Sequence, residues 1–179
     1  IATFPPGGVR LESGEQLEAD VIVTATGLNL LIFGGVEMEV EGAPVTPPET
    51  VAFKGLMLSG VPNFAFAIGY TNASWTLKID LVCEHLCRLL THMDEHGLGS
   101  VAPVAPAGAE TKPLLDFEAG YVLRALHELP RQGTESPWHL AQDHAKDVRF
   151  LGGPVEDPAL RFTPRAAAAA PEPELEAAA

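Results

Sequence analysis

The chain has 179 residues, of which 46% are hydrophobic, so it can bury the core of one domain and is not disordered throughout. Its 24 Asp and Glu outnumber 11 Lys and Arg, and the resulting net charge of −13 would repel a nucleic-acid phosphate backbone. The 17 Gly and 16 Pro show no three-residue period, which excludes collagen and favours short strands and turns.

The ends and apolar stretches of the chain give no sign of targeting. The longest mostly apolar stretch, residues 21–36, is interrupted by Gly27 and is shorter than the roughly 18 residues of a membrane-spanning helix. We therefore expect no transmembrane segment. The chain starts at Ile1 without an initiator methionine or an apolar leader, so we expect no secretory signal and expect the chain to be part of a longer protein.

The first 60 residues predict a hairpin, a buried strand and an irregular connection. Residues 9–12 and 16–19 alternate between polar and apolar side chains around Gly14, as in a β-hairpin. Residues 20–27 are mostly β-branched and end in glycine, which is typical of a strand buried on both faces of a parallel sheet. Residues 28–60 are rich in Gly, Pro and Glu, and they predict a connection with only short strand pieces.

A second strand and a long helix follow. Residues 64–68 form another apolar run that ends in glycine, so we expect a second strand of the same parallel sheet. A helix from about Trp75 to Met93 is predicted by apolar side chains at helical spacing, with Asn72 or Ser74 as its N-cap.

The C-terminal part predicts an appendage. Residues 101–113 are rich in Pro, Ala and Gly and are expected to form a linker. Residues 114–165 are expected to form a helical extension, with helices over 117–129 and 137–150. Residues 166–179 contain mainly Ala, Pro and Glu, and we expect a disordered tail.

Thiol and imidazole side chains gather on the long predicted helix, at Cys83, His85, Cys87, His92 and His96. Zinc prefers such ligands, but His85 points away from the helix face that carries both cysteines, so three ligands cannot converge from this helix alone. We expect no metal site, and we expect Cys83 and Cys87 to be small buried hydrophobic residues. Their spacing is unusual for a structural disulfide, and reduced thiols predict a cytoplasmic location.

Familiar catalytic motifs are missing. Gly97, Gly99 and Ala102 match the G-x-G-x-x-A dinucleotide pattern, but they follow a helix, and Pro103 and Pro106 exclude the helix that should receive the pyrophosphate. The sequence contains no P-loop and no G-x-S-x-G elbow, so it assigns no catalytic residue.

The two predicted strand ends form the best candidate site. Thr26 and Gly27 end the first strand, and residues 69–76 join the second strand to the long helix. Open α/β sheets bind ligands at the carboxyl ends of their strands. A helix N-terminus at that place offers free amides and about half a positive charge, so we expect an anion or an electron-rich ring there.

Two segments of the chain resemble the class B flavoprotein monooxygenases. Residues 20–27 read D-x-x-x-x-A-T-G, and residues 69–77 read G-Y-x-N-x-S-W-T-L, a variant closest to the Baeyer–Villiger subgroup that includes an ethionamide-activating monooxygenase. An L-P-x-Q-G stretch at residues 129–133, followed by Pro137-Trp138, is also similar to that subgroup. The resemblance covers most of residues 9–151.

The resemblance implies an α/β fold: the C-terminal part of a Rossmann-like flavoprotein with two dinucleotide-binding domains. It would contain the hairpin, the parallel-sheet strands, the long helix and the helical C-terminal appendage, with residues 1–100 as the C-terminal portion of the FAD-binding domain. The family's fingerprints for FAD and NADPH and its active-site arginine are not present. We therefore expect part of a larger enzyme that by itself cannot hold FAD well or accept NADPH.

The resemblance also implies a reaction, in which FAD is reduced by NADPH and one oxygen atom of O₂ enters a ketone or adds to sulfur or nitrogen. Thr26 and Gly27 would then approach FAD. The residues passing its isoalloxazine and ribityl groups would be Gly69, Tyr70, Thr71 and Asn72. The amides facing its pyrimidine edge would be those of Ser74, Trp75, Thr76 and Leu77. The expected partners are a small ketone or sulfide, O₂ and the missing N-terminal domains.

Two other functions remain open from the sequence. The chain could be an interaction module that has lost catalysis, with a stable fold and a partner contact but no flavin. It could also be an oxidoreductase of the wider pyridine-nucleotide flavoprotein group that passes electrons to a thiol or a quinone. Only Cys83 and Cys87 could serve the thiol version, and their spacing is not the redox C-x-x-C.

Overall fold

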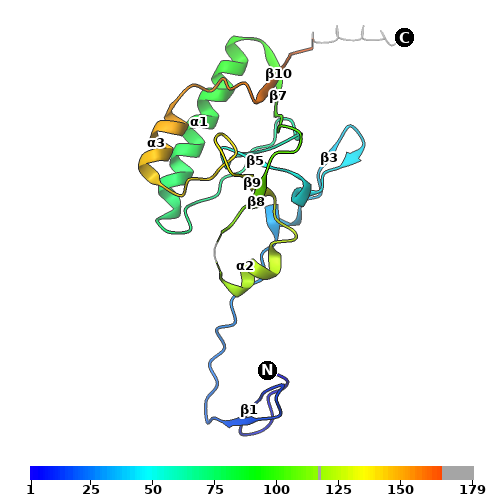
Figure 1. Ribbon diagram of the computed structural model, residues 1–179, viewed down its shortest axis with the longest axis vertical. Helices are drawn as coiled ribbons and strands as arrows, with labels where there is room; N and C mark the ends of the chain where they lie inside the picture. The colour runs from blue at the N-terminus through cyan, green and yellow to red at the C-terminus, as the bar shows by residue number, and fades with distance from the viewer. Residues whose placement is uncertain (117, 167–179) are drawn as a thin grey trace, which may run out of the picture.

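The computed structural model describes residues 1–116 and 118–166 (Figure 1). Its helices are α1 (Trp75–Glu95), α2 (Gly120–Ala125) and α3 (His144–Gly152), with short 3-10 helices η1 (Ile32–Gly35) and η2 (Pro47–Glu49). Its strands are β1 (Gly8–Arg10), β2 (Gln16–Glu18), β3 (Glu39–Val40), β4 (Ala43–Pro44), β5 (Ala52–Phe53), β6 (Met57–Leu58), β7 (Leu98–Pro103), β8 (Thr111–Pro113), β9 (Arg131–Gly133) and β10 (Leu160–Pro164). In the described part of the chain they pair as antiparallel two-stranded sheets: β1–β2, β3–β4, β5–β6, β7–β10 and β8–β9. The α/β character is thus confirmed.

The N-terminal hairpin is confirmed. Val9 pairs with Leu17 and Arg10 with Gln16, and the turn contains Gly14 at a φ of +88°, which glycine adopts without a steric penalty. Figure 1 shows the hairpin at one end of the molecule, joined to the rest by an extended segment.

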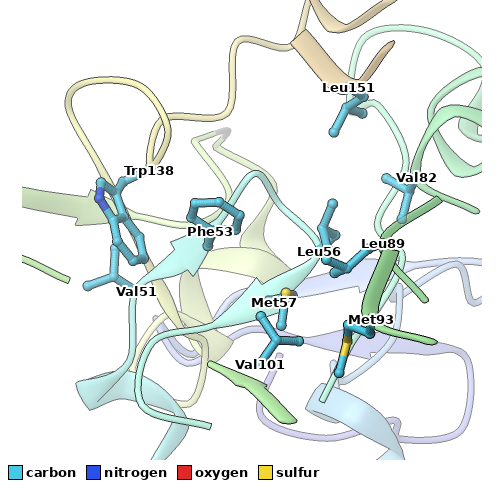
Figure 2. Packing of buried hydrophobic residues seen from close by; sticks show 10 residues of the cluster. All are labelled: Val51, Phe53, Leu56, Met57, Val82, Leu89, Met93, Val101, Trp138 and Leu151. Atoms are coloured by element: carbon cyan, nitrogen blue, oxygen red, sulfur yellow. The ribbon is translucent and has the colours of Figure 1, made fainter. Parts of the chain in front are cut away.

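The main core lies between the β5–β6 hairpin, α1 and the C-terminal elements. The Phe53 and Trp138 rings pack edge to face with 5.4 Å between their centroids, and α1 contributes side chains spaced three and four apart. Figure 2 shows the ten buried side chains of this cluster: Val51, Phe53, Leu56, Met57, Val82, Leu89, Met93, Val101, Trp138 and Leu151. The core therefore joins residues from both the predicted N-terminal portion and the predicted appendage.

Helix α1 begins at Trp75, as predicted, and ends at Glu95. Gly97 follows with a φ of +63°, as expected just beyond a helix end. Helix α3 packs beside α1 (Figure 1), and Arg88 of α1 donates hydrogen bonds to the carbonyls of Leu151 and Gly153 at the C-terminal end of α3. This contact satisfies carbonyls that the end of α3 leaves unpaired.

The prediction of two parallel strands is wrong for this structure. Residues 20–27 are in no strand, and Val21 and Val23 are 78% and 84% exposed. Residues 64–68 contain only an isolated antiparallel bridge between Ala65 and Met57. An apolar run forms a buried parallel strand only where strands lie on both sides of it, and the described residues provide none here.

The segments after α1 also differ from their predictions. The segment 101–113, expected to be a linker, begins within β7 and ends with β8. Helix α2 is shorter than the predicted 117–129, and residue 117 lies outside the described residues. The helix predicted over 137–150 begins only at His144, where Asp143 caps it by accepting a 3.1 Å hydrogen bond from the Lys146 amide. The predicted disordered tail lies outside the described residues, apart from residue 166.

The first part of the predicted 137–150 helix is a loop, because the Gln132 side chain binds a backbone amide that a helix would use for its own hydrogen bonds. The Gln132 Oε1 atom accepts a 2.9 Å hydrogen bond from the Leu140 amide, and the Gln132 amide donates to the Pro113 and Leu114 carbonyls. Gln142 adopts a φ of +51°, outside the helical region. The helix can therefore start only after Gln142.

The cysteine prediction is wrong as well. Cys83 and Cys87 are exposed free thiols, because the buried face of α1 carries Lys78, Val82, His85, Leu89 and Met93 instead. Among the described residues, no helix combines the length and the apolarity needed to cross a bilayer.

Candidate functional site

An apolar cavity of about 420 Å³ lies where the two predicted site segments approach helix α2. Thr71 and Trp75 of the predicted site line it. Its other walls come from residues 30–33, residues 66–68 and the part of the chain around α2, including Leu115 and Tyr121. A cavity of this size and character suits the apolar part of a small molecule or cofactor.

Gly69 allows the start of α1 to lie close to the preceding segment. A Cβ at residue 69 would lie 2.6 Å from the Trp75 Cα and 2.5 Å from its Cγ, distances that real Cβ atoms do not show. Residues 71–77 are exposed, and Trp75 and Leu77 keep 56% and 44% of their surface accessible. Residues 70–77, which we call the turn, therefore bring the start of α1 close to Gly69 and expose the apolar side chains of Trp75 and Leu77 to solvent.

The start of α1 is free of carboxylates. Its first turn contains no acidic residue, and the N-cap residue Ser74 makes no side-chain capping hydrogen bond. The Ser74 and Thr76 hydroxyls instead pair with each other at 2.9 Å. The first amides of a helix have no partner within the helix, so here they can donate to a ligand and favour negative charge.

Behind this turn lies a buried polar cluster of Tyr70, Lys78 and Asp147. The Tyr70 hydroxyl donates to Asp147 Oδ2 at 2.8 Å, and the Lys78 ammonium donates to the same oxygen at 2.9 Å. All three residues are at most 3% exposed. Burial, with the hydrogen bond to Asp147, raises the pKa of the Tyr70 hydroxyl well above its usual range, so this hydroxyl stays protonated.

Gln142 holds the exposed side of the same turn. Its Oε1 accepts hydrogen bonds from the Thr71 amide at 3.0 Å and from the Thr71 hydroxyl at 3.3 Å. Its backbone carbonyl accepts a 3.0 Å hydrogen bond from the Asn72 side-chain amide. The turn is thus fixed by residues about 70 positions further along the chain.

The first predicted site segment lies near the cavity but does not line it. Thr26 and Gly27 are exposed, and Gly27 has a φ of +80°. A Cβ at Gly27 would lie 3.8 Å from the Tyr121 ring, and Arg124 donates to the Leu28 carbonyl at 3.5 Å. Helix α2 therefore contacts the first segment through Arg124 and lines the cavity with the second segment through Tyr121.

Sequence reasoning missed three contributors to the site: Tyr121, Gln142 and Asp147. The sequence around Tyr121 predicted a helix but not its position at a cavity. Asp147 is one of 24 acidic residues, and only its burial distinguishes it from a solvated one. Within residues 1–116 and 118–166, no three His, Cys, Asp or Glu side chains are placed to hold a metal ion.

Comparison with known proteins places the chain among the relatives of the flavin-dependent monooxygenases. The resemblance noted at residues 20–27 and 69–77 is thereby confirmed at the level of the class.

The particular relatives are bacterial. The chain is 50% identical over 169 residues to the FAD-containing monooxygenase EthA of Mycobacterium tuberculosis, covering 93% of this chain and 35% of that protein. It is 42% identical over 165 residues to the putative FAD-containing monooxygenase MymA of the same species, covering 90% and 33%. It is 38% identical over 164 residues to the probable FAD-binding monooxygenase AlmA of an Acinetobacter species, covering 87% and 33%. The chain thus spans about a third of the length of these curated relatives. No family model matches it, and no solved structure gives a significant match.

Proposed function

We propose that the chain forms one wall of the flavin site in an FAD-dependent monooxygenase that uses NADPH and O₂. Its substrates are ketones, which take up oxygen in a Baeyer–Villiger reaction, or compounds with an oxidisable sulfur or nitrogen. Residues 1–100 belong to a Rossmann-like FAD-binding domain, and residues 114–165 extend it. The rest of the site comes from regions that correspond to the other two thirds of the relatives.

The observation that supports this proposal is the exposed start of α1 beside an apolar cavity. The chain is 50% identical to an FAD-containing monooxygenase, and its residues 74–77 present the first amides of α1, which have no partner within the helix, with no acidic residue in that first turn. The adjoining cavity receives Thr71 and Trp75. This combination of donors and apolar surface matches the two sides of a flavin, a polar pyrimidine edge and an apolar ring system.

The residues present fit FAD in their donor chemistry. The amides of Ser74, Trp75, Thr76 and Leu77 would donate to the pyrimidine edge, where a helix N-terminus stabilises negative charge by up to about 2 kcal/mol. Thr71 and Asn72 would face the isoalloxazine and ribityl groups, while Gly69 and Tyr70 are buried behind them and would shape the turn. Thr26 and Gly27 would approach the cofactor from the other segment. FAD would supply the oxygen chemistry, while this chain orients it and shields it from water.

Electron transfer to a thiol of this chain has less support. Cys83 and Cys87 are exposed and do not line the cavity that contains Thr71 and Trp75.

The test uses a hybrid enzyme, in which this chain replaces the matching segment of M. tuberculosis EthA. We expect the hybrid to be purified with bound FAD, seen as visible flavin absorbance. Thr76→Glu should weaken FAD binding at least tenfold. Its carboxylate would compete with the flavin for the amides at the helix start and would repel negative charge on the pyrimidine edge. The matched control is Thr91→Glu, since Thr91 is also an exposed threonine of α1 but lies near its other end.

Three outcomes would contradict the proposal. The first is a folded hybrid without FAD, and the second is equal FAD affinity for the Thr76→Glu and Thr91→Glu hybrids. The third is stoichiometric FAD in the purified 179-residue chain alone, since a site shared with other regions cannot be complete in it. Loss of folding does not account for the expected effect of Thr76→Glu, because a carboxylate at a helix start stabilises the helix.

A further inference from the structure

The turn that leads into α1 is held from behind by two residues of the C-terminal part of the chain. Tyr70 at the start of the turn and Lys78 in the second turn of α1 both donate to one oxygen of Asp147. Between them, Thr71 and Asn72 donate to Gln142. We call Gln142 and Asp147 the anchor residues.

Burial makes the Asp147 anchor rigid. The Lys78 and Asp147 side chains are 2% and 4% exposed, so water does not compete for their 2.9 Å contact. The Lys78 ammonium also lies 5.2 Å from the centre of the Tyr70 ring. A charge buried to this degree stays in place only where its partners are fixed, so the positions of Tyr70 and Lys78 are coupled to that of α3.

Gln142 adds a contact that the backbone does not favour by itself. Its φ of +51° lies in the left-handed region, which is uncommon for residues other than glycine. In this conformation its side chain reaches the Thr71 amide and its carbonyl reaches Asn72. An unfavourable backbone conformation of this kind persists only where surrounding contacts hold it. Here the contacts that hold it are the hydrogen bonds from Thr71 and Asn72.

We propose that Gln142 and Asp147 are positioning residues, which fix the direction in which the turn presents the amides of residues 74–77 and the Trp75 ring to a flavin. This inference rests on the proposed function. The anchors do not line the cavity, so they act through the turn. The ion pair is not required for stability as such, since apolar residues of similar volume often replace buried pairs at little cost. Instead, Asp147 connects both ends of one exposed turn to α3, one through Tyr70 and the other through Lys78.

The first part of the test uses the full 179-residue chain without cofactor. Hydrogen exchange is measured for Asp147→Asn, Gln142→Gly and the control Asp143→Asn. The Gln142→Gly variant suits the left-handed backbone and lacks only the side chain. Asp143→Asn makes the same chemical change as Asp147→Asn on a residue whose capping role asparagine can take over. In Gln142→Gly we expect at least tenfold faster exchange of the Thr71 amide, because it loses its acceptor. In both anchor variants we expect the same of amides 78–81, the first that are hydrogen-bonded within α1, and no change in the control.

The second part uses the same variants in the hybrid enzyme. We expect the anchor variants to bind FAD about tenfold more weakly and to shift or broaden the flavin absorption bands, a change that altered stability alone does not produce. Gln142→Glu keeps an oxygen acceptor and should restore the spectrum that Gln142→Gly loses. Because Asp147→Asn leaves Lys78 unpaired and can prevent folding, Gln142→Gly carries the test in that case.

The outcomes separate the two proposals. A folded wild-type hybrid without FAD overturns the proposed function and this inference with it. A wild-type hybrid that binds FAD, with an unchanged flavin spectrum and affinity in Gln142→Gly, overturns the inference and leaves the proposed function standing. Unchanged exchange of the Thr71 amide and of amides 78–81 in Gln142→Gly likewise overturns the inference.

Discussion

The Lys78–Asp147 pair gives the most decisive stability prediction. Both side chains are almost completely buried, so removing one partner leaves a charge in the interior with no opposite charge to offset its desolvation. Such a change typically costs roughly 3–5 kcal/mol of the free energy of unfolding. We expect a loss of this size for Lys78→Met and for Asp147→Leu separately. It is a large part of the roughly 5–15 kcal/mol that stabilises a typical domain.

The combined variants should behave differently from the sum of the single ones. Lys78→Met with Asp147→Leu removes both charges and leaves only the Tyr70 hydroxyl without its acceptor, a cost of about 1–3 kcal/mol. Adding Tyr70→Phe removes that donor too, so the triple variant should lie within about 1 kcal/mol of the wild-type chain. The losses are not additive, because each single substitution leaves the other charge buried without a partner and the double substitution does not.

The assay is urea unfolding of the 179-residue chain, followed by tryptophan fluorescence. The buried Trp138 reports on the main core, and a control series carrying Trp75→Phe removes the signal of the exposed tryptophan. With a denaturant slope of about 2 kcal/mol per molar, a loss of 3 kcal/mol lowers the midpoint by about 1.5 M. The reasoning is refuted if either single variant loses less than about 1 kcal/mol, or if the double variant loses as much as both single variants together.

Two further predictions concern Gly69 and His85. Gly69→Ala should lower the free energy of unfolding by about 1–3 kcal/mol, since its Cβ would overlap the Trp75 backbone. The control Gly152→Ala has open space around it and should change this free energy by less than about 1 kcal/mol. Equal effects of the two substitutions in urea unfolding would contradict the close approach at Gly69. Burial lowers the pKa of His85 in the folded chain below the value of about 6.5 that it has in the unfolded chain. As the pH falls below about 6.5, His85 is protonated in the unfolded chain before it is protonated in the folded one, so the free energy of unfolding should decrease. His85→Gln cannot be protonated and should flatten this part of the stability-against-pH curve; an unchanged slope would refute the assignment.

The candidate site was predictable where its signal is local. The G-Y-x-N-x-S-W-T-L pattern at residues 69–77 marked both the helix start and the class of protein, because caps, glycines and helical spacing act within a few residues. The parts that the sequence did not reveal come from distant residues. Gln142 and Asp147 meet the turn only because α3 packs against α1, and no local pattern encodes that packing.

By itself, the sequence determined the hairpin around Gly14, the bounds of α1 to within two residues and the relationship to flavin-dependent monooxygenases. Tertiary structure alone decided which face of α1 is buried, since it placed His85 inside and Cys83 outside. It also decided the state of residues 20–27, whose apolar run is compatible with a buried strand but lies exposed among the described residues. The physical reason is the same in both cases: a side-chain pattern states what a segment can bury, and only its neighbours in space decide whether it does.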